Sequence, residues 1–416
     1  MFWPLACSSL WSRKGSALLT FFAITVSVYV LLGVEQIRHQ AKDSFSNTVS
    51  GIDLIVGART GDINLLLYSV FRIGNATNNI SWDSYQKIAA SPKIAWTIPI
   101  ALGDSHQGYR VMGTTKDYFT HFRYGQDNAL ALAEGQFFSE LFDVVIGSEV
   151  AKTLHYQTGD ELILAHGVAS TSFSNHDDTP FKVTGVLQPT GTPVDQTLHI
   201  SLQGIEAIHV GWSNGVKLPG QSFAAATLSQ QDFTPDSITA FMVGLKSKLA
   251  TFNLQRQINT YRGEPLLAIL PGVTLTQLWQ MMAVMENTLR LISALVLLAS
   301  LLGLAAMLLA SIRERQHEIA VMRAMGASPW FLLLLIELEA LLITLCGSIT
   351  ALFLLLASLN FAEGLLAEQF NLFLGNNLLN TQTALYLVFI NLGGLLVGLL
   401  PGISAYRRAL HQQLGN

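Results

Sequence analysis

The sequence predicts a membrane protein with four transmembrane α-helices, one N-terminal and three C-terminal, and a large mixed α/β domain between the first and the second. Its 416 residues are 50% hydrophobic and 12% charged, which is too apolar for an ordinary soluble protein and too polar for one wholly within the bilayer. Long uncharged runs lie near the N-terminus and in the last third of the chain. The stretch between them alternates polar turn residues with short apolar segments, as folded domains in water do.

The first apolar run covers residues 15–34 and follows Arg13 and Lys14. A helix of this length rises about 30 Å, which matches the hydrocarbon core of a bilayer. A signal peptide is the alternative, but the run is longer than a typical apolar signal core and lacks a cleavage pattern of small residues near Gly33. We therefore expect residues 1–14 to be cytoplasmic and residues 15–34 to be an uncleaved first transmembrane helix.

Residues 35–288 are expected to form a periplasmic domain with a stalk. Turn signals separate short apolar segments at 53–56, 144–146, 161–164 and 181–187. The last of these alternates apolar and polar residues, which predicts a half-buried strand, and helices are predicted at 81–90 and 148–154. Apolar residues recur at three- and four-residue steps from Leu275 to Leu291, which predicts a helix that runs into the second span. This helix is interpreted as a stalk, and a surface helix of the domain is the alternative.

Three further spans are predicted at 289–310, 330–359 and 384–405, with a short periplasmic loop at 360–383 and a cytoplasmic tail at 406–416. Glycines recur every four residues in the last span and leave one helix face open to a close neighbour. We expect helix packing at Gly347, Gly394, Gly398 and Gly402.

Basic residues define the orientation of the spans. Arginine and lysine precede the first span, arginines lie between the second and the third, and Arg407 and Arg408 follow the last, whereas the loop at 360–383 has neither residue type. The positive-inside rule therefore places both termini and residues 311–329 in the cytoplasm. The large domain then lies on the other side, which is the periplasm in a Gram-negative cell.

The charged segment at 311–329 is predicted to be a short amphipathic helix with a sharp corner after it. Glu314 to Met325 contains helix formers without glycine or proline, and Gly326 suits a left-handed helix end. Ser328 and Pro329 are then the preferred residues at the start of a following helix. Glu337 and Glu339 are expected near the cytoplasmic membrane interface, because charge in the middle of a bilayer is costly.

The string E-R-Q-H-E-I-A-V-M-R-A-M-G-A-S from Glu314 to Ser328, followed by Glu339-Ala340 and Gly347, resembles the FtsX-type permease domain of ABC transporters, which the MacB, LolC/LolE and FtsX proteins share. The preceding domain resembles the MacB-type periplasmic core domain at 109–119, 134–138, 145–151 and 181–187. The family pattern of one span, a large periplasmic domain and three further spans covers the whole chain. Gln316, His317, Ala320 and the segment 329–332 depart from the residues that are frequent in these permeases.

The resemblance implies a cytoplasmic LolD- or MacB-like ABC ATPase as partner, a second permease copy or paralogue, and a periplasmic adaptor or lipoprotein. It also implies that residues 311–329 are the coupling helix that receives the motion of the ATPase. The residues expected to take part are Glu314, Glu318, Ile319, Met322, Arg323, Gly326 and Ser328, with Glu339 as an acid at the membrane interface.

The chain itself is expected to catalyse no reaction. The phosphate-binding motif G-x-x-x-x-G-K-[ST] does not occur, so ATP and Mg are expected in the partner and no cofactor in this chain. A net charge of -4 argues against a nucleic-acid partner. The weak metal-ligand candidates His166, His176, Asp177 and Asp178 follow none of the usual ligand spacings, so we expect no metal site.

The leading hypothesis is a non-catalytic permease subunit in the bacterial inner membrane, which uses force from the ATPase to move an envelope or periplasmic substrate such as a lipoprotein, a peptide or a small molecule. The alternative is an FtsX-like scaffold that regulates a periplasmic enzyme without transport. A third hypothesis is a metal-binding or hydrolytic domain for which the spans are only an anchor.

Overall fold

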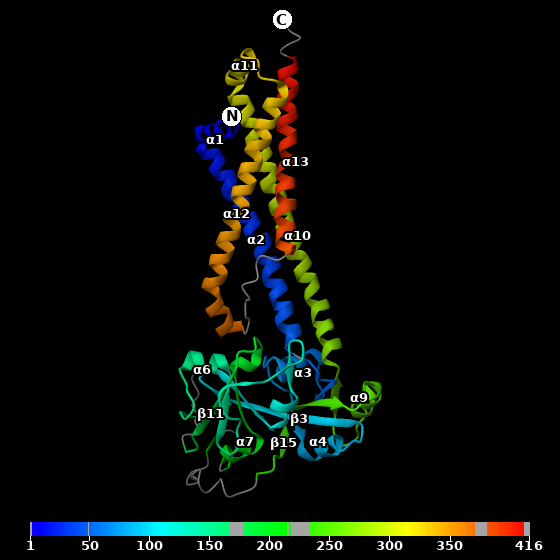
Figure 1. Ribbon diagram of the computed structural model, residues 1–416. Coiled ribbons are helices and arrows are strands. Elements are labelled where there is room, and N and C mark those ends of the chain that lie inside the picture. The colour runs from blue at the N-terminus through cyan, green and yellow to red at the C-terminus, as the bar shows by residue number, and fades with distance from the viewer. Residues whose placement is uncertain are drawn as a thin grey trace. The chain divides into compact units, whose positions relative to one another are not determined.

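The computed structural model describes residues 2–48, 50–166, 178–210, 212–213, 216–217, 233–370 and 381–411. The chain forms two compact units (Figure 1). Unit 1 comprises Met1–Ala41 and Met282–Asn416, and unit 2 comprises Lys42–Met281.

Unit 1 is built from helices. These are α1 (Phe2–Ser12), α2 (Lys14–Asn47), α10 (Pro271–Glu314), α11 (Gln316–Ala324), α12 (Pro329–Phe370) and α13 (Thr381–His411). In the described part of the chain, four helical segments are long and apolar enough to cross a membrane: Lys14–Gln40, Pro271–Glu314, Pro329–Phe361 and Thr381–Arg407. One precedes the α/β domain and three follow it, which confirms the predicted fold class.

Several helices of unit 1 extend beyond the predicted spans. α2 continues to Asn47, and α12 continues to Phe370 through part of the segment predicted as a loop. The acidic residues after position 359 end the apolar run, but glutamate is a good helix former and does not end the helix. The rest of that predicted loop, 371–380, lies outside the described residues. The sequence analysis did not predict α1.

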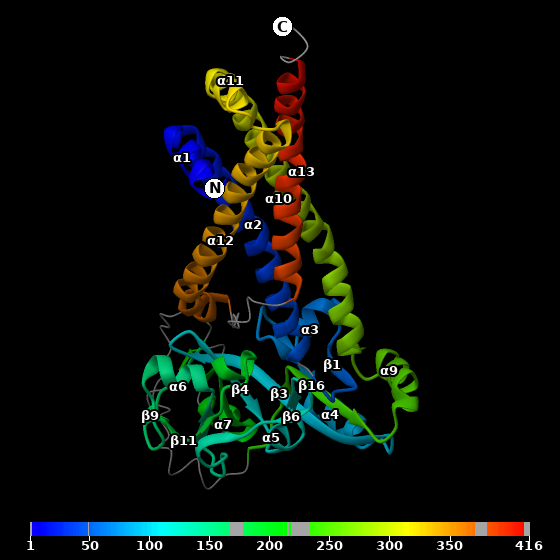
Figure 2. The ribbon, with the colours of Figure 1, turned by 45° about the horizontal axis from the view of Figure 1, so that its top comes forward.

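Unit 2 contains short helices and a mixed sheet (Figure 2). Its helices are α3 (Asp62–Val70), α4 (Trp82–Ala89), α5 (Asp117–His121), α6 (Ser148–Leu154), η1 (Pro193–Gln196), α7 (Leu202–Ile208), η2 (Lys248–Ala250) and α9 (Thr251–Asn259). α4 and α6 confirm the helices predicted at 81–90 and 148–154.

The large sheet has the order β17-β1-β16-β3-β4-β12-β8-β11-β7, and β10 and β9 pair with β3 and β11. These strands are β1 (Leu54–Ala58), β3 (Ile94–His106), β4 (Tyr109–Thr114), β7 (Leu132–Gly135), β8 (Asp143–Ile146), β9 (Glu161–Leu162), β10 (Ala165–His166), β11 (Phe181–Leu187), β12 (Thr197–Ser201), β16 (Ala240–Leu245) and β17 (Leu266–Ile269). Short two-stranded pairs join β2 (Ile80–Ser81) to β15 (Ser237–Ile238), β5 (Arg123–Tyr124) to β6 (Asn128–Ala129), and β13 (Trp212–Ser213) to β14 (Val216–Lys217). β11 confirms the strand predicted at 181–187, and the apolar segments noted at 53–56, 144–146 and 161–164 contribute to β1, β8 and β9.

β3 joins the two halves of the large sheet. Its first part, from Ile94 to Ile100, pairs with β16, and its second part, from Ala101 to His106, pairs with β4. Most neighbouring strands are antiparallel, but β4 runs parallel to β12 and β8 runs parallel to β11.

Alternate residues of the strands face opposite sides of the sheet and build separate cores. Ile55, Met112 and Val145 belong to one core, which α3 and α5 cover. On the other side, one core contains Leu54 and Val56 with α4 and α9, and another contains Val111 and Val144 with α6 and α7. Residues two positions apart on a strand therefore belong to the same core, and both faces of these strands are buried. Leu275 of α10 packs against the first core, so α10 begins on the α/β domain and continues as one helix to Glu314.

Candidate coupling site

The segment between α10 and α12 makes a sharp corner. α10 ends at Glu314, Arg315 lies outside helical geometry with φ -98° and ψ 19°, and α11 follows from Gln316. The expectation of one helix from Glu314 to Met325 was therefore wrong at its start. Glu314, predicted as part of the coupling helix, is the last residue of α10. The chain turns at Arg315. The Arg315 side chain contacts residues of α1, α11 and α12.

The C-terminus of α11 is closed by backbone hydrogen bonds around Gly326. The φ angle of Gly326 is +95°, the left-handed geometry that glycine adopts most easily. The amide of Ala327 donates to the carbonyl of Met322 at 3.0 Å, and the amide of Gly326 donates to that of Arg323 at 3.0 Å. This pair of bonds defines a Schellman motif. The Arg323 Nη1 atom also donates to the carbonyl of Ala327 at 2.7 Å.

The next helix starts at once. The amide of Phe331 donates to Oγ of Ser328 at 3.2 Å, and Pro329 is the first residue of α12. Serine therefore caps the helix, and proline takes the first helical position, where its missing N–H has no consequence. Together the two motifs determine the direction of α11 relative to α12.

All nine residues of α11 are partly or fully exposed. Ile319 packs against the helical core of unit 1, and Met322 is half-buried, whereas Glu318 is exposed. Met325, expected on the same face as these apolar residues, is 76% exposed. Val321 of α11 and Trp330 of α12 are also exposed. The corner therefore presents apolar side chains that the described residues of this chain do not cover.

A buried carboxylate connects the corner to the N-terminal helix. Glu339 of α12 is 2% exposed, and it accepts a short hydrogen bond from Ser9 Oγ of α1. Its Oε1 atom lies 3.5 Å from Nη1 of Arg315, and its Oε2 atom lies 3.6 Å from Nη2 of Arg13. A carboxylate in an apolar bundle is expected to be paired in this way, because an isolated charge there is costly.

Both arginines also bind groups on other helices. Arg315 donates from Nε to Glu318 of α11 at 2.6 Å and from Nη1 to Ser9, and Arg13 donates from Nη2 to Ser9 at 3.0 Å. The two arginines and the two glutamates have a formal net charge of zero. This group, called the Glu339 cluster below, links α1, α11 and α12 at the end of α10.

A second charged cluster joins α2 to α10. Nε and Nη2 of Arg290 donate to the Glu35 carboxylate at 3.0 to 3.1 Å, and Arg38 donates to Glu35 at 2.5 Å. Arg38 also lies 3.6 Å from Glu286 of α10. Arg290 and Arg315 are separated by the apolar run of α10, so α10 has an ionic attachment at each end of that run. Between them, the hydroxyls of Ser27 and Ser300 lie 2.6 Å apart.

The glycines predicted to pack helices lie against neighbours in the same chain. A Cβ atom added to Gly394 of α13 would lie 2.5 Å from Cγ2 of Thr344 in α12, and one added to Gly398 would lie 3.0 Å from Ala340. Gly402 faces Leu333 of α12 at 3.4 Å. The glycine face of α13 therefore packs on α12.

Gly347 lies on α12 but faces a different helix. A Cβ atom added there would lie 3.0 Å from Cγ2 of Ile24 in α2. α12 therefore packs closely against both α2 and α13, and small residues make both contacts close.

The metal-ligand candidates are not brought together by the described structure. His166 ends β10 and Asp178 lies in an exposed turn, whereas His176 and Asp177 lie outside the described residues. Among the residues that the structure describes, His, Cys, Asp and Glu side chains form no group of three or more that could hold a metal ion.

The partners of Glu339 were not predicted from the sequence. Arg13 and Arg315 were used only to orient the spans, and Ser9 was not considered. One signal could have found them: an acid within an apolar helix needs a cation, and these two arginines lie next to the ends of other spans. The identity of the cations was therefore accessible from the sequence, but their convergence on one carboxylate was not.

Two family models match the sequence. Residues 17–261 match the family model of the MacB-like periplasmic core domain, and residues 290–414 match that of the FtsX-like permease C-terminal domain. A solved structure of the extracellular domain of the noncanonic ABC-type transporter YknZ from Gram-positive bacteria is similar at 12% identity and a TM-score of 0.31. That match covers 52% of this chain and 98% of the YknZ chain. No curated protein matches the sequence.

The model of the MacB-like periplasmic core domain alone covers more than half of the chain, and the two models together overlap all four apolar helices and most of the α/β domain. The chain is a multi-pass membrane protein, and it belongs to the family of ABC transporter permeases that combine a MacB-like periplasmic core domain with an FtsX-like permease domain.

Proposed function

We propose that this chain is a non-catalytic permease subunit that transmits force from a separate cytoplasmic ABC ATPase to its α/β domain. The ATPase, of the LolD or MacB kind, binds ATP and Mg. The permease resides in the bacterial inner membrane with the α/β domain in the periplasm, and it works with a second permease copy or paralogue. The moved substrate is an envelope or periplasmic molecule, namely a lipoprotein, a peptide or a small molecule.

The continuity of α10 is the observation that carries this proposal. α10 runs unbroken for 44 residues from Pro271, beside the core of the α/β domain, to Glu314, beside α11. A helix of this length extends about 66 Å. A displacement at one end of such a helix is passed to the other end, because shortening it would break backbone hydrogen bonds.

The corner supplies the input side of the mechanism. α11 is exposed and presents Val321 and Met325, while Trp330 lies exposed at the start of α12. An ATPase surface can therefore contact both helices at once. The Schellman motif and the serine cap hold α11 at a set angle to α12, so a push on α11 moves α12 with it. The Glu339 cluster extends this connection to α1.

The proposal is tested with the permease and its ATPase reconstituted together in nanodiscs. Spin labels on exposed positions of α9, at Asn253 and Gln257, report the motion of the α/β domain during ATP turnover. We expect ATP-dependent changes in the distance between these labels and a label on α11. A distance that is the same with ATP, with a non-hydrolysable analogue and without nucleotide would contradict force transmission.

The same preparation distinguishes transport from regulation. ATP-driven motion together with release or transfer of an envelope substrate is the result expected of a transporter. Motion that activates a periplasmic enzyme without moving a substrate would instead identify an FtsX-like scaffold. Co-purification in mild detergent identifies the ATPase and the second permease subunit.

A further inference from the structure

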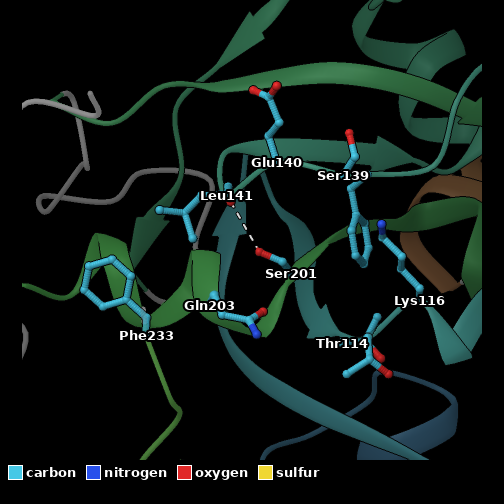
Figure 3. Close-up of a pocket in the computed structure, with 10 residues that line it drawn as sticks. Thr114, Lys116, Ser139, Glu140, Leu141, Ser201, Gln203 and Phe233 are labelled. Atoms are coloured by element: carbon cyan, nitrogen blue, oxygen red, sulfur yellow. Dashed lines mark hydrogen bonds between the residues drawn. The ribbon is translucent and has the colours of Figure 1, made fainter. Parts of the chain in front are cut away.

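A pocket of about 390 Å³ lies in the α/β domain (Figure 3). Four parts of the chain line it: the end of β4 and the turn after it, the loop before β8, the start of α7, and the segment before β15. The lining residues are Thr114, Thr115, Lys116, Phe138, Ser139, Glu140, Leu141, Ser201, Gln203 and Phe233. The volume is within the range of about 300–1,000 Å³ that is typical of ligand sites.

The sheet topology explains why a pocket forms here. β4 and β12 are adjacent and parallel, so their carboxyl ends, at Thr114 and Ser201, lie at the same edge. α5 follows β4 and packs into the core on one side of the sheet, whereas α7 follows β12 and packs into a core on the other side. The connections after the two strands therefore diverge and leave a crevice. Such divergence at the carboxyl ends of parallel strands is where open α/β sheets bind ligands.

Several polar atoms of the lining are already used by the fold. Oγ of Ser201 donates to the carbonyl of Leu141 at 3.3 Å and accepts from the amide of Gly204 at 2.9 Å. Oγ1 of Thr114 donates to the carbonyl of Pro99 at 2.8 Å. These bonds hold the strand ends and leave the recognition of a ligand to other side chains.

Two longer polar side chains remain for a ligand. Lys116 and Gln203 come from different segments of the lining, whereas the carboxylate of Glu140 extends away from both of them (Figure 3). Lys116, Glu140 and Gln203 are all exposed. Within the described part of the chain, Lys116 has no carboxylate within 4.0 Å of its ammonium group.

Apolar residues complete the wall. Phe138 is 3% exposed and belongs to the core under α5, and it is joined at the pocket by Leu141 and Phe233. The site thus offers an apolar surface, one ammonium group, and one amide that can both donate and accept hydrogen bonds.

We propose that this pocket binds a short peptide that carries an apolar side chain and a free carboxylate. Lys116 pairs with the carboxylate, Gln203 bonds a peptide group, and the apolar wall receives the side chain. A fatty acid would use Lys116 and the apolar wall but would make no hydrogen bond with the Gln203 amide. The proposal concerns binding alone, so it does not depend on the proposed function.

The test uses the full-length protein in nanodiscs without any ATPase. The probes are the tripeptide alanyl-phenylalanyl-alanine with free termini, the same peptide with acetylated and amidated termini, and laurate. Binding is measured by saturation-transfer NMR and by calorimetric titration. We expect the free tripeptide to bind at least about tenfold more tightly than its capped form, because charge-assisted hydrogen bonds are the stronger ones.

Two variants and a control assign the binding to this pocket. Lys116→Gln is expected to weaken the free tripeptide about tenfold and to leave the capped peptide unchanged, whereas Gln203→Ala weakens both. Lys248→Gln alters an exposed lysine of η2 in the same domain, outside the pocket lining, and should change neither affinity. Hydrogen exchange at β12 verifies that each variant is folded.

Three results would overturn the proposal. The first is a failure of both peptides to bind at millimolar concentration. The second is equal affinity of the wild type and Lys116→Gln for the free tripeptide. The third is binding of laurate in preference to both peptides, which would assign the pocket to an amphiphilic lipid.

Discussion

Glu339 of α12 and Arg315, the residue between α10 and α11, lie 3.5 Å apart, although 24 positions separate them along the chain. The contact closes the loop that contains α11, and the Ser9 and Arg13 side chains join it from the N-terminal side. The carboxylate of Glu339 therefore connects α12 to the N-terminal segment and to the turn between α10 and α11.

Replacement of this carboxylate is expected to destabilise the helical unit. Glu339→Gln leaves two guanidinium groups near each other without their shared counter-charge, and breaking a buried ion pair in this way costs about 3 kcal/mol. Thermal unfolding in detergent measures the loss. Glu314→Gln, which changes an exposed acid at the end of α10, is the matched control and should unfold like the wild type.

A double variant separates the pair from its surroundings. If Arg315 and Glu339 stabilise each other, Glu339→Gln combined with Arg315→Gln should be less destabilised than the sum of the two single variants. Strict additivity would mean that the contact does not contribute.

The geometry of Gly326 predicts an uncoupled variant. Gly326→Val forces a β-branched residue into a left-handed conformation, which is strained by at least about 1–2 kcal/mol. A Cβ atom there would meet no described atom within 4 Å, so the effect comes from the backbone and not from a steric clash. We expect normal membrane insertion but at least about a tenfold loss of coupled activity in proteoliposomes.

Gly303→Val is the control for this experiment. Gly303 lies within α10, where an added Cβ atom likewise meets no described atom within 4 Å, but its φ angle is not in the left-handed region. Equal coupled activity of Gly326→Val and the wild type would show that the Schellman corner is not needed for coupling.

The glycine face of α13 predicts a packing defect. Gly394→Ala places a methyl group 2.5 Å from Thr344 of α12, which is too close without a helix shift. Overpacking of this kind costs about 1–3 kcal/mol. Gly15→Ala, with nothing within 4 Å of the new atom, should leave the melting temperature unchanged or raise it slightly. Equal melting temperatures for Gly394→Ala and Gly15→Ala would contradict the close packing of α12 on α13.

The buried His199 predicts a pH dependence for the α/β domain. Burial and the nearby Arg72 lower the pKa of His199 from 6.5 to about 3. Below about pH 6.5, His199 binds a proton in the unfolded chain but not in the folded chain. The contribution of His199 to the free energy of unfolding is therefore fully present above pH 6.5 and is lost as the pH falls. The loss is about 1.4 kcal/mol per pH unit between pH 6.5 and 3.

Comparison with His199→Phe isolates this effect. The pKa of His209, whose Nε2 atom lies 3.7 Å from the Asp104 carboxylate, is raised and acts in the opposite direction, but this effect is present in both proteins and cancels. Hydrogen exchange of the β12 amides in the full-length protein is the measurement. Tyr118→Phe alters the ring stacked on His199 at 5.2 Å and should keep the wild-type slope, since the pKa of Tyr118 is raised to about 12. Equal slopes for His199→Phe and the wild type would contradict the prediction.

The parts of this architecture that follow from local patterns could be read from the sequence. Uncharged runs predict the spans because the bilayer requires them, and Gly326, Ser328 and Pro329 predict the corner because few residues suit those backbone geometries. The extension of α12 to Phe370 was missed because membrane span length and helix length are determined by different forces.

The parts that depend on tertiary contacts could not be read in this way. Ser9 and Glu339 are 330 positions apart, and their hydrogen bond depends on how α1 packs beside α12. Likewise, the pocket combines Lys116 and Gln203 because parallel pairing brings the ends of β4 and β12 together. Strand order is not encoded in the period of a single segment.

β3 is one continuous strand that spans both halves of the large sheet of the α/β domain. Its 13 residues first pair with β16 and then with β4, so each half of the large sheet is hydrogen-bonded to the same piece of backbone. The halves cannot slide past each other unless one of these ladders breaks. If α10 transmits force as proposed, the two halves of the sheet move as one body, and the pocket at the end of β4 keeps its shape.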